Sequence, residues 1–372
     1  MIINGALMKI NVKKQTSAKR YVNNNPWKVQ YLIKMTAFLS IRQHFFFFFA
    51  INPNLLRYYS VFKRFFIILA TFASAATEAH AQYDVSFSHY FDMEPTFNAA
   101  AVGKQPKLNI TAAYALDMAG FENNPNTMYA AADMPVRFIG ALHGVGLQFM
   151  NDKIGLFSHQ RLALQYAYKH KLFGGTISAG VNVGLLSESF DGSKVDAGES
   201  SDPALATSKV DGNGLDLGAG LYYNRGPWYV GVSATHLNAP LIELGERNEL
   251  KIDPTYYLTA GYDIKLRNPF LTVKTSALGR TDGVAWRADV TGRLVYTNEK
   301  KVMYAGLTYS PNTSVTLLIG GRVHGVMLGY SYECYTSAMS LGNGSHELFI
   351  GYQMDLNMTK KGKNRHQSVR IL

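Results

Sequence analysis

Residues 284–296 read Val-Ala-Trp-Arg-Ala-Asp-Val-Thr-Gly-Arg-Leu-Val-Tyr, and they carry the clearest structural signal in the chain. Apolar and polar side chains alternate along this stretch, which is the period of a β-strand and not of a helix. Arg287, Asp289 and Arg293 share the polar face. We expect these three to line or plug a polar lumen, where they can pair with acids on neighbouring strands such as Asp216, Asp263 or Glu333.

The same alternation recurs in fourteen segments between Lys107 and Met358. A wall between lipid and a polar lumen requires this two-residue period, and bacterial single-chain barrels have an even number of strands. The pattern predicts an all-β fold, a transmembrane antiparallel β-barrel of about fourteen strands, with twelve as the alternative. The expected strands are 107–116, 126–134, 142–150, 159–170, 172–186, 213–224, 228–237, 255–266, 270–279, 284–297, 300–309, 314–322, 325–334 and 346–358.

The connections between these segments alternate between short and long. Tight turns such as 225–227 and 298–299 alternate with polar loops at 187–212, 238–254 and 335–345. Outer-membrane barrels combine short periplasmic turns with long extracellular loops. This asymmetry predicts that both termini of the chain lie in the periplasm.

Composition fits a barrel and excludes a nucleic-acid-binding body. The chain is 47% hydrophobic, yet it contains no run of the roughly 20 apolar residues that a spanning helix needs. A soluble β-sandwich could share this composition. The net charge of +11 arises at the ends of the chain. Eleven of the 37 basic residues precede Gln82 and five follow Thr359, whereas one of the 26 acids precedes Gln82 and none follows Thr359. The 82–359 body is therefore slightly acidic.

The beginning of the chain is typical of a secretory leader. Lys63-Arg64 precedes an apolar run at 65–76, and Ala79-His80-Ala81 fits signal-peptidase cleavage before Gln82. We expect a leader at 1–81 with its signal core at 63–81, and residues 1–60 are a misassigned start if translation begins at Val61. A lead-in at 82–106, the barrel at 107–358 and a basic periplasmic tail at 359–372 follow. The tail is either solvated or docks on an acidic periplasmic partner.

Residue groups that resemble catalytic or metal sites have simpler interpretations. Ser345-His346-Glu347 holds the residue types of a hydrolase triad, but neighbours on a strand point to opposite faces. Asn151–Gly155 resembles a tight loop, and Asp191-Gly192 and Asp211–Gly214 resemble solvated loops without the spacing of calcium ligands. We assign no catalytic, cofactor-binding or metal-binding residue, and we expect no enzyme activity.

The histidines and the cysteine also lack a site pattern. The histidines are spaced too widely to form a metal-ligand motif, and we expect them on the rim or in the lumen. Cys334 is the only cysteine, and its strand face with Val326, Leu328 and Tyr330 predicts a lipid-facing position. The histidines in question are His143, His159, His170, His236, His324 and His346.

Several strings resemble the PorP/SprF family over essentially all of 82–352. They include 144–148 running into 151–155, 217–223, and Leu328–Tyr332 leading to Gly344–Glu347. The lead-in is similar to the family's N-terminal segment, with His89-Tyr90-Phe91 and the stretch 98–103, although Ala99 stands where proline is common. The resemblance implies an outer-membrane component of the type IX secretion system of Bacteroidota. It also implies partners: cargo with a C-terminal sorting domain, including gliding adhesins, and periplasmic or lipoprotein subunits of the machine.

Three functions follow as hypotheses. The first is a non-enzymatic barrel in the Gram-negative outer membrane that supports export or surface attachment of such cargo. The second is a passive porin or small-solute transporter, because the lumen is either open or blocked by side chains or by the lead-in. The third, a hydrolase at the outer rim, needs a nucleophile and a base on one face, and we find no such pair.

Overall fold

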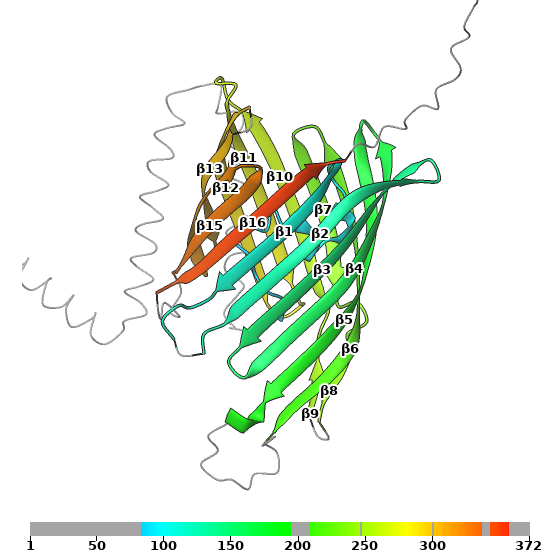
Figure 1. The fold of residues 1–372 in the computed structure, drawn as a ribbon, viewed down its shortest axis with the longest axis vertical. Helices are drawn as coiled ribbons and strands as arrows, with labels where there is room; N and C mark the ends of the chain where they lie inside the picture. The colour runs from blue at the N-terminus through cyan, green and yellow to red at the C-terminus, as the bar shows by residue number, and fades with distance from the viewer. Residues whose placement is uncertain are drawn as a thin grey trace, which may run out of the picture. The chain divides into compact units, whose positions relative to one another are not determined.

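The computed structural model describes residues 83–121, 123–194, 208–245, 248–299, 301–336 and 343–356. Fourteen strands form a closed antiparallel barrel (Figure 1), which confirms the predicted fold and strand number. The expected leader and basic tail lie outside the described residues. The barrel strands are β1 (Lys107–Leu116), β2 (Asn126–Phe138), β3 (Ala141–Ile154), β4 (Phe157–Leu172), β5 (Gly175–Asp191), β6 (Lys209–Arg225), β7 (Trp228–Thr235), β10 (Thr255–Lys265), β11 (Leu271–Thr281), β12 (Trp286–Asn298), β13 (Lys301–Ser310), β14 (Ser314–Val323), β15 (Val326–Tyr335) and β16 (Ser345–Asp355).

Each strand pairs with its sequence neighbour, and the first pairs with the last. β1 closes the barrel against β16 with Lys107 opposite Asp355 and Leu116 opposite His346. Closure removes every free sheet edge from the wall, so its backbone groups are hydrogen-bonded where no water is available. The described part of the chain contains no helix long and apolar enough to cross a membrane.

Alternation along the strands produces the two faces of the wall. In β4, Leu162, Leu164 and Tyr166 are exposed on the outer face, whereas Arg161 and Gln165 are buried toward the lumen. β12 follows the same rule, with Val290 and Leu294 outward and Asp289 inward. The exposed apolar side chains form the lipid-facing surface that a membrane barrel requires.

The connections confirm the alternation of short and long links, but two predicted loops contain strand. β5 extends to Asp191 and β6 begins at Lys209, so both strands reach into the predicted 187–212 loop. A hairpin of β8 (Leu241–Leu244) and β9 (Asn248–Lys251) forms within the 238–254 connection. Ile242 of β8 packs over Gly212 and Gly214 of β6, where a Cβ atom would lie 2.7 and 3.0 Å from it. Here glycine permits close strand packing and does not mark a turn.

Two smaller expectations about loops were wrong. Asn151–Ile154 belong to β3, and only residues 155–156 form the turn, where Gly155 has φ +60°. Asp211–Gly214 belong to β6, and Asp191 ends β5 before the short 3-10 helix η4 (Gly192–Lys194). Cross-strand pairing overrides the turn propensity of these residues: Asp152 lies opposite Thr127 and accepts its hydroxyl hydrogen bond at 2.6 Å.

The outer face yields a first prediction. Replacing Leu164, which is 66% exposed in the middle of β4, with arginine places a charge in the hydrocarbon region. The free energy of unfolding in lipid vesicles should fall by about 2–4 kcal/mol. Leu241→Arg, at a 54% exposed position of the β8–β9 hairpin outside the barrel wall, is the control and should cost much less. Equal losses would contradict the assignment of the lipid face.

Candidate functional site

The lumen is occupied by the chain's own N-terminal segment. Residues 83–103, called the plug here, run inside the barrel before β1 begins, and Figure 1 shows this segment behind the front strands. The plug contains two 3-10 helices, η2 (Glu94–Thr96) and η3 (Ala99–Ala101). Its residues 97–103 are buried, and Ala100 and Val102 have no exposed surface. The lead-in is therefore the core of the barrel.

Glycines on the inner wall allow the plug backbone to lie directly against the strands. A Cβ atom added to Gly180 of β5 would lie 2.3 Å from the amide nitrogen of Ala100, and one on Gly144 of β3 would lie 2.1 Å from the carbonyl oxygen of Val102. A Cβ atom on Gly220 of β6 would lie 2.2 Å from the side-chain oxygen of Asn98. Any side chain at these positions would displace η3, so the wall has a glycine floor shaped to the plug.

Asn98 fixes η3 on this floor. Its side-chain oxygen accepts a hydrogen bond from the amide of Ala100 at 2.9 Å, which caps the helix. Its amide donates to the carbonyl of Leu221 at 3.2 Å, and the side chain is fully buried. One residue thus orders the helix and attaches it to β6.

A latch holds the start of the plug near the end of the barrel that has the long connections. It consists of Asp84, His236, Asp216 and Arg161 and is called the outer latch here. The imidazole of His236 bridges Asp84 at 3.0 Å and Asp216 at 2.8 Å. Arg161 forms an ion pair with Asp216 at 2.7 Å. These charges are buried but paired, which is the condition under which buried charge is tolerated.

Electrostatics keeps this latch ionised. Burial, the largest effect, lowers the pKa of His236, but the carboxylates of Asp84 and Asp216 outweigh it and raise the pKa to about 9. Burial alone would raise the pKa of Asp84, yet His236, Arg161 and a hydrogen bond from Tyr257 hold it below its usual range. The imidazolium and its carboxylates are therefore charged at neutral pH.

Neighbouring groups extend the latch. The hydroxyl of Tyr83 donates a short hydrogen bond to Glu188, which also contacts His159. The Tyr83 ring meets the rings of His159 and His236 edge-on, with centroids 5.3 and 5.2 Å apart. Arg280 donates to the carbonyl of Val85 at 3.2 Å.

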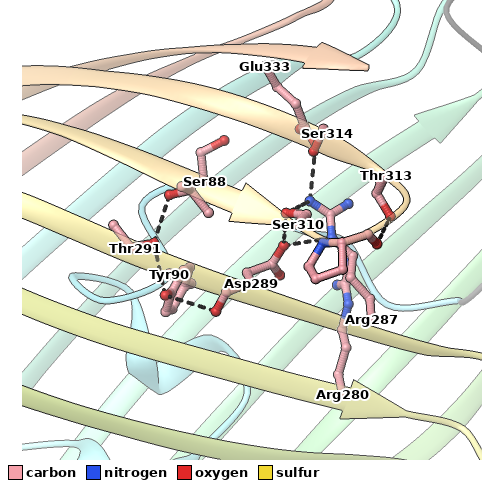
Figure 2. A network of polar contacts seen from close by, with 12 residues as sticks. Ser88, Tyr90, Arg280, Arg287, Asp289, Thr291, Ser310, Thr313, Ser314 and Glu333 are labelled. Carbon is pink, nitrogen blue, oxygen red and sulfur yellow. Dashed lines mark hydrogen bonds and ion pairs between the residues drawn. The ribbon is translucent and has the colours of Figure 1, made fainter. Parts of the chain in front are cut away.

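The middle of the plug binds the opposite wall. Glu347 of β16 accepts hydrogen bonds from the amide of Ser88 at 2.6 Å and from the amide of His89 at 3.0 Å, and it contacts the His89 ring at 2.6 Å. Figure 2 shows Tyr90 beside Thr291, whose hydroxyl oxygen lies 2.9 Å from the Tyr90 hydroxyl. Aromatic side chains pack beside these contacts: Tyr90, Phe91 and Phe97 form a cluster with Tyr257 and Tyr304.

The predicted lumen charges lie on the inner wall, but of the acids predicted as their partners only Glu333 pairs with one of them within the described residues, whereas Asp263 pairs with Lys274. Arg287 pairs with Asp289 at 2.9 Å and with Glu333 at 3.0 Å, a network drawn in Figure 2. Asp216, a predicted partner of these charges, instead binds His236 and Arg161 in the outer latch. Arg293 pairs with Asp92 of the plug at 3.4 Å and stacks over the Phe91 ring, with its guanidinium carbon 3.3 Å from the centroid.

The motifs set aside as non-catalytic are now located. Ser345 and Glu347 are buried and the half-buried His346 between them contacts Tyr330, so the three do not form a triad. Cys334 is exposed on its strand, as its predicted lipid-facing position requires. No group of three or more metal-ligating side chains occurs within the described ranges.

Sequence reasoning missed His89 and Asp84 as lumen residues. The sequence features that could have predicted them were indirect. These features are an aromatic lead-in and, after it, strands with glycine at inward positions. The contacts between the plug and the wall are hydrophobic packing, hydrogen bonds and ion pairs. They define a plugged barrel as the class of protein.

Comparisons with known proteins place the chain more narrowly. A family model described as type IX secretion system membrane protein PorP/SprF matches residues 79–352, and the chain belongs to this family. It is an outer-membrane β-barrel of a family of secretion components and not of known enzymes. No curated protein matches the sequence.

Solved structures similar to this chain include a hydrocarbon channel, a toluene transporter and a porin. The CymD monoaromatic hydrocarbon channel is 12% identical with a TM-score of 0.46, over 75% of this chain and 95% of its own. The toluene transporter TodX of Pseudomonas putida is 10% identical with a TM-score of 0.43, over 73% and 95%. The KdgM porin is 10% identical with a TM-score of 0.32, over 67% and 99%.

The glycine floor leads to a second prediction. Gly180→Ala should push η3 off the wall and lower the free energy of unfolding by about 1–3 kcal/mol, the usual cost of overpacking. Gly292→Ala is the matched control, because its Cβ would meet nothing within 4 Å. Chemical unfolding in vesicles measures both. A Gly180→Ala protein as stable as the control would contradict the close packing.

The outer latch leads to a third prediction, on pH. The pKa of His236 is raised in the folded state, so its stabilising contribution is complete below about pH 6.5 and is lost as pH rises through about 9. The lowered pKa of Asp84 gives a contribution that is present above about pH 4 and lost as pH falls below it. Thermal unfolding of wild type and His236→Gln should differ most near pH 6 and converge above pH 9. A constant difference would contradict this account.

Proposed function

We propose that this barrel is a non-conducting component of the type IX secretion system that supports export or surface attachment of proteins with a C-terminal sorting domain. The plug carries this proposal. A segment with buried polar and aromatic contacts on both sides of the lumen suits a rigid platform better than a passage for solutes.

The outer end offers the contact surface that such a role needs. β5, β6 and the β8–β9 hairpin form a projecting unit there, consolidated by Leu186, Ile242 and Ile252. Cargo of the gliding-adhesin type would meet this side, and periplasmic or lipoprotein subunits would meet the end with short turns. The plug makes contacts along the barrel between the two ends.

The passive-porin alternative requires an open lumen. The channel-like structures similar to this chain have TM-scores below 0.5 and carry no argument for transport. The residues that would line a pore are already engaged: Arg161, Arg287 and Arg293 are all paired. We therefore favour the secretion role.

The fourth prediction concerns cells. Deleting the gene in its native host should abolish surface display of specific sorting-domain cargo, measured by antibody labelling of intact cells. Complementation with wild type should restore display. Gly292→Ala should restore it equally, because the added Cβ atom would meet nothing within 4 Å. Normal display in a clean deletion strain would contradict the proposed function.

A further inference from the structure

A cavity of about 420 Å³ lies beneath the plug at the end of the barrel with short turns. Plug residues Phe91, Met93 and Glu94 form its roof. Its sides come from the first residues of β1 and β15 and the last residues of β12, β14 and β16. We call it the vestibule. Its size falls within the roughly 300–1,000 Å³ typical of ligand pockets.

Polar atoms in the vestibule wall lack partners within the described residues. The Tyr304 hydroxyl, the Nε atoms of Arg293 and Arg322, and the side-chain oxygen of Asn109 are buried and make no hydrogen bond. Tyr304 is 6% exposed and Arg293 is 9% exposed. Four such atoms around one cavity are unusual, because buried polar groups are generally hydrogen-bonded. Three of them can donate a hydrogen bond, so this part of the wall holds donors that the described residues leave unsatisfied.

The charges around the vestibule leave one cation without a carboxylate partner. Five cationic side chains line the vestibule: Lys104, Lys107, Lys274, Arg293 and Arg322. Three carboxylates, Asp92, Glu94 and Asp133, line it as well. Asp263 and Asp355 lie within ion-pair distance of Lys274 and Lys107, so cations and carboxylates are equal in number. Asp133 accepts hydrogen bonds from the Gly103 amide at 2.7 Å and from Asn109 at 3.1 Å, and it lies on β2, four strands around the wall from β14.

Arg322 is the cation without an acid. Four of the five pair with carboxylates: Lys104 with Glu94, Lys107 with Asp355, Lys274 with Asp263, and Arg293 with Asp92. Arg322 has only a 3.5 Å contact with Gln353 in the described part of the chain. Its planar guanidinium is suited to bidentate recognition of a carboxylate.

The position of the vestibule narrows the possible occupant. The cavity lies inside the wall, whereas lipids approach the outer face. The chain's own tail after Thr359 has five basic residues and no acid, so it brings no side-chain carboxylate for Arg322. A soluble acidic segment arriving from the periplasm has the complementary charge.

We propose that the vestibule binds an acidic peptide segment of a periplasmic protein, with a carboxylate of that segment on Arg322. This inference rests on the proposed function, because it identifies the chemistry of a periplasmic partner. The basic tail adds long-range attraction and the vestibule adds specificity.

The test uses the full mature protein in nanodiscs of neutral lipid and a fluorescent hexaglutamate peptide, with hexaglutamine as the uncharged control. Anisotropy should show saturable binding of hexaglutamate alone. Arg322→Gln should weaken it at least tenfold, because one end of a charge-assisted contact is lost. Arg267→Gln removes an exposed charge from the neighbouring β10–β11 turn and should change affinity less than twofold. Arg322→Lys, which keeps the charge but loses the planar bidentate geometry, should bind more weakly than wild type and more tightly than Arg322→Gln.

Several results would overturn the proposal. These are equal binding by wild type and Arg322→Gln, equal loss in Arg267→Gln, or loss only on truncation after Thr359. Displacement of the peptide by phosphatidylglycerol in the nanodisc would identify a lipid headgroup instead. Heat-modifiable migration on gels verifies folding of each variant. If deletion abolishes cargo display while these binding results fail, this inference alone is wrong; if display is normal, the proposed function fails whatever the peptide does.

Discussion

Close contact between the plug backbone and the glycine floor of β3, β5 and β6 is the constraint on which the rest of the structure depends. Gly144, Gly180 and Gly220 leave room for η3, and no larger residue fits without moving it. Because η3 lies there, the aromatic residues before it reach the far wall, and Asp84 reaches His236 near the outer end. A barrel of fourteen strands thereby gains the packed interior that its wall alone could not supply.

Buried charges in the lumen are organised in pairs that tie the plug to separate strands. His236 joins Asp84 to Asp216 of β6, Glu347 of β16 holds the amides of Ser88 and His89, and Arg293 of β12 holds Asp92. Breaking one partner would leave the other charge buried and unpaired, which is strongly destabilising. The plug is therefore attached around much of the circumference.

Much of the barrel was predictable from residue order, and the interior was not. Period-two alternation located all fourteen wall strands, and the polar face of β12 placed Arg287 beside Glu333 correctly. The partner of Arg293 was missed because alternation describes a wall and says nothing of a segment inside it. The glycines misled at 211–214, where they allow β8 to pack on β6. A glycine in sequence does not reveal whether it marks a turn or a close approach.

The central claim is that residues 83–103 fill the lumen of the folded protein. Planar-bilayer recording of purified wild type beside a variant lacking these residues tests it most directly. The account predicts no steady conductance from wild type and persistent openings from the variant, provided that the variant shows heat-modifiable migration on gels. A steady, solute-permeable conductance from the wild-type barrel would contradict it.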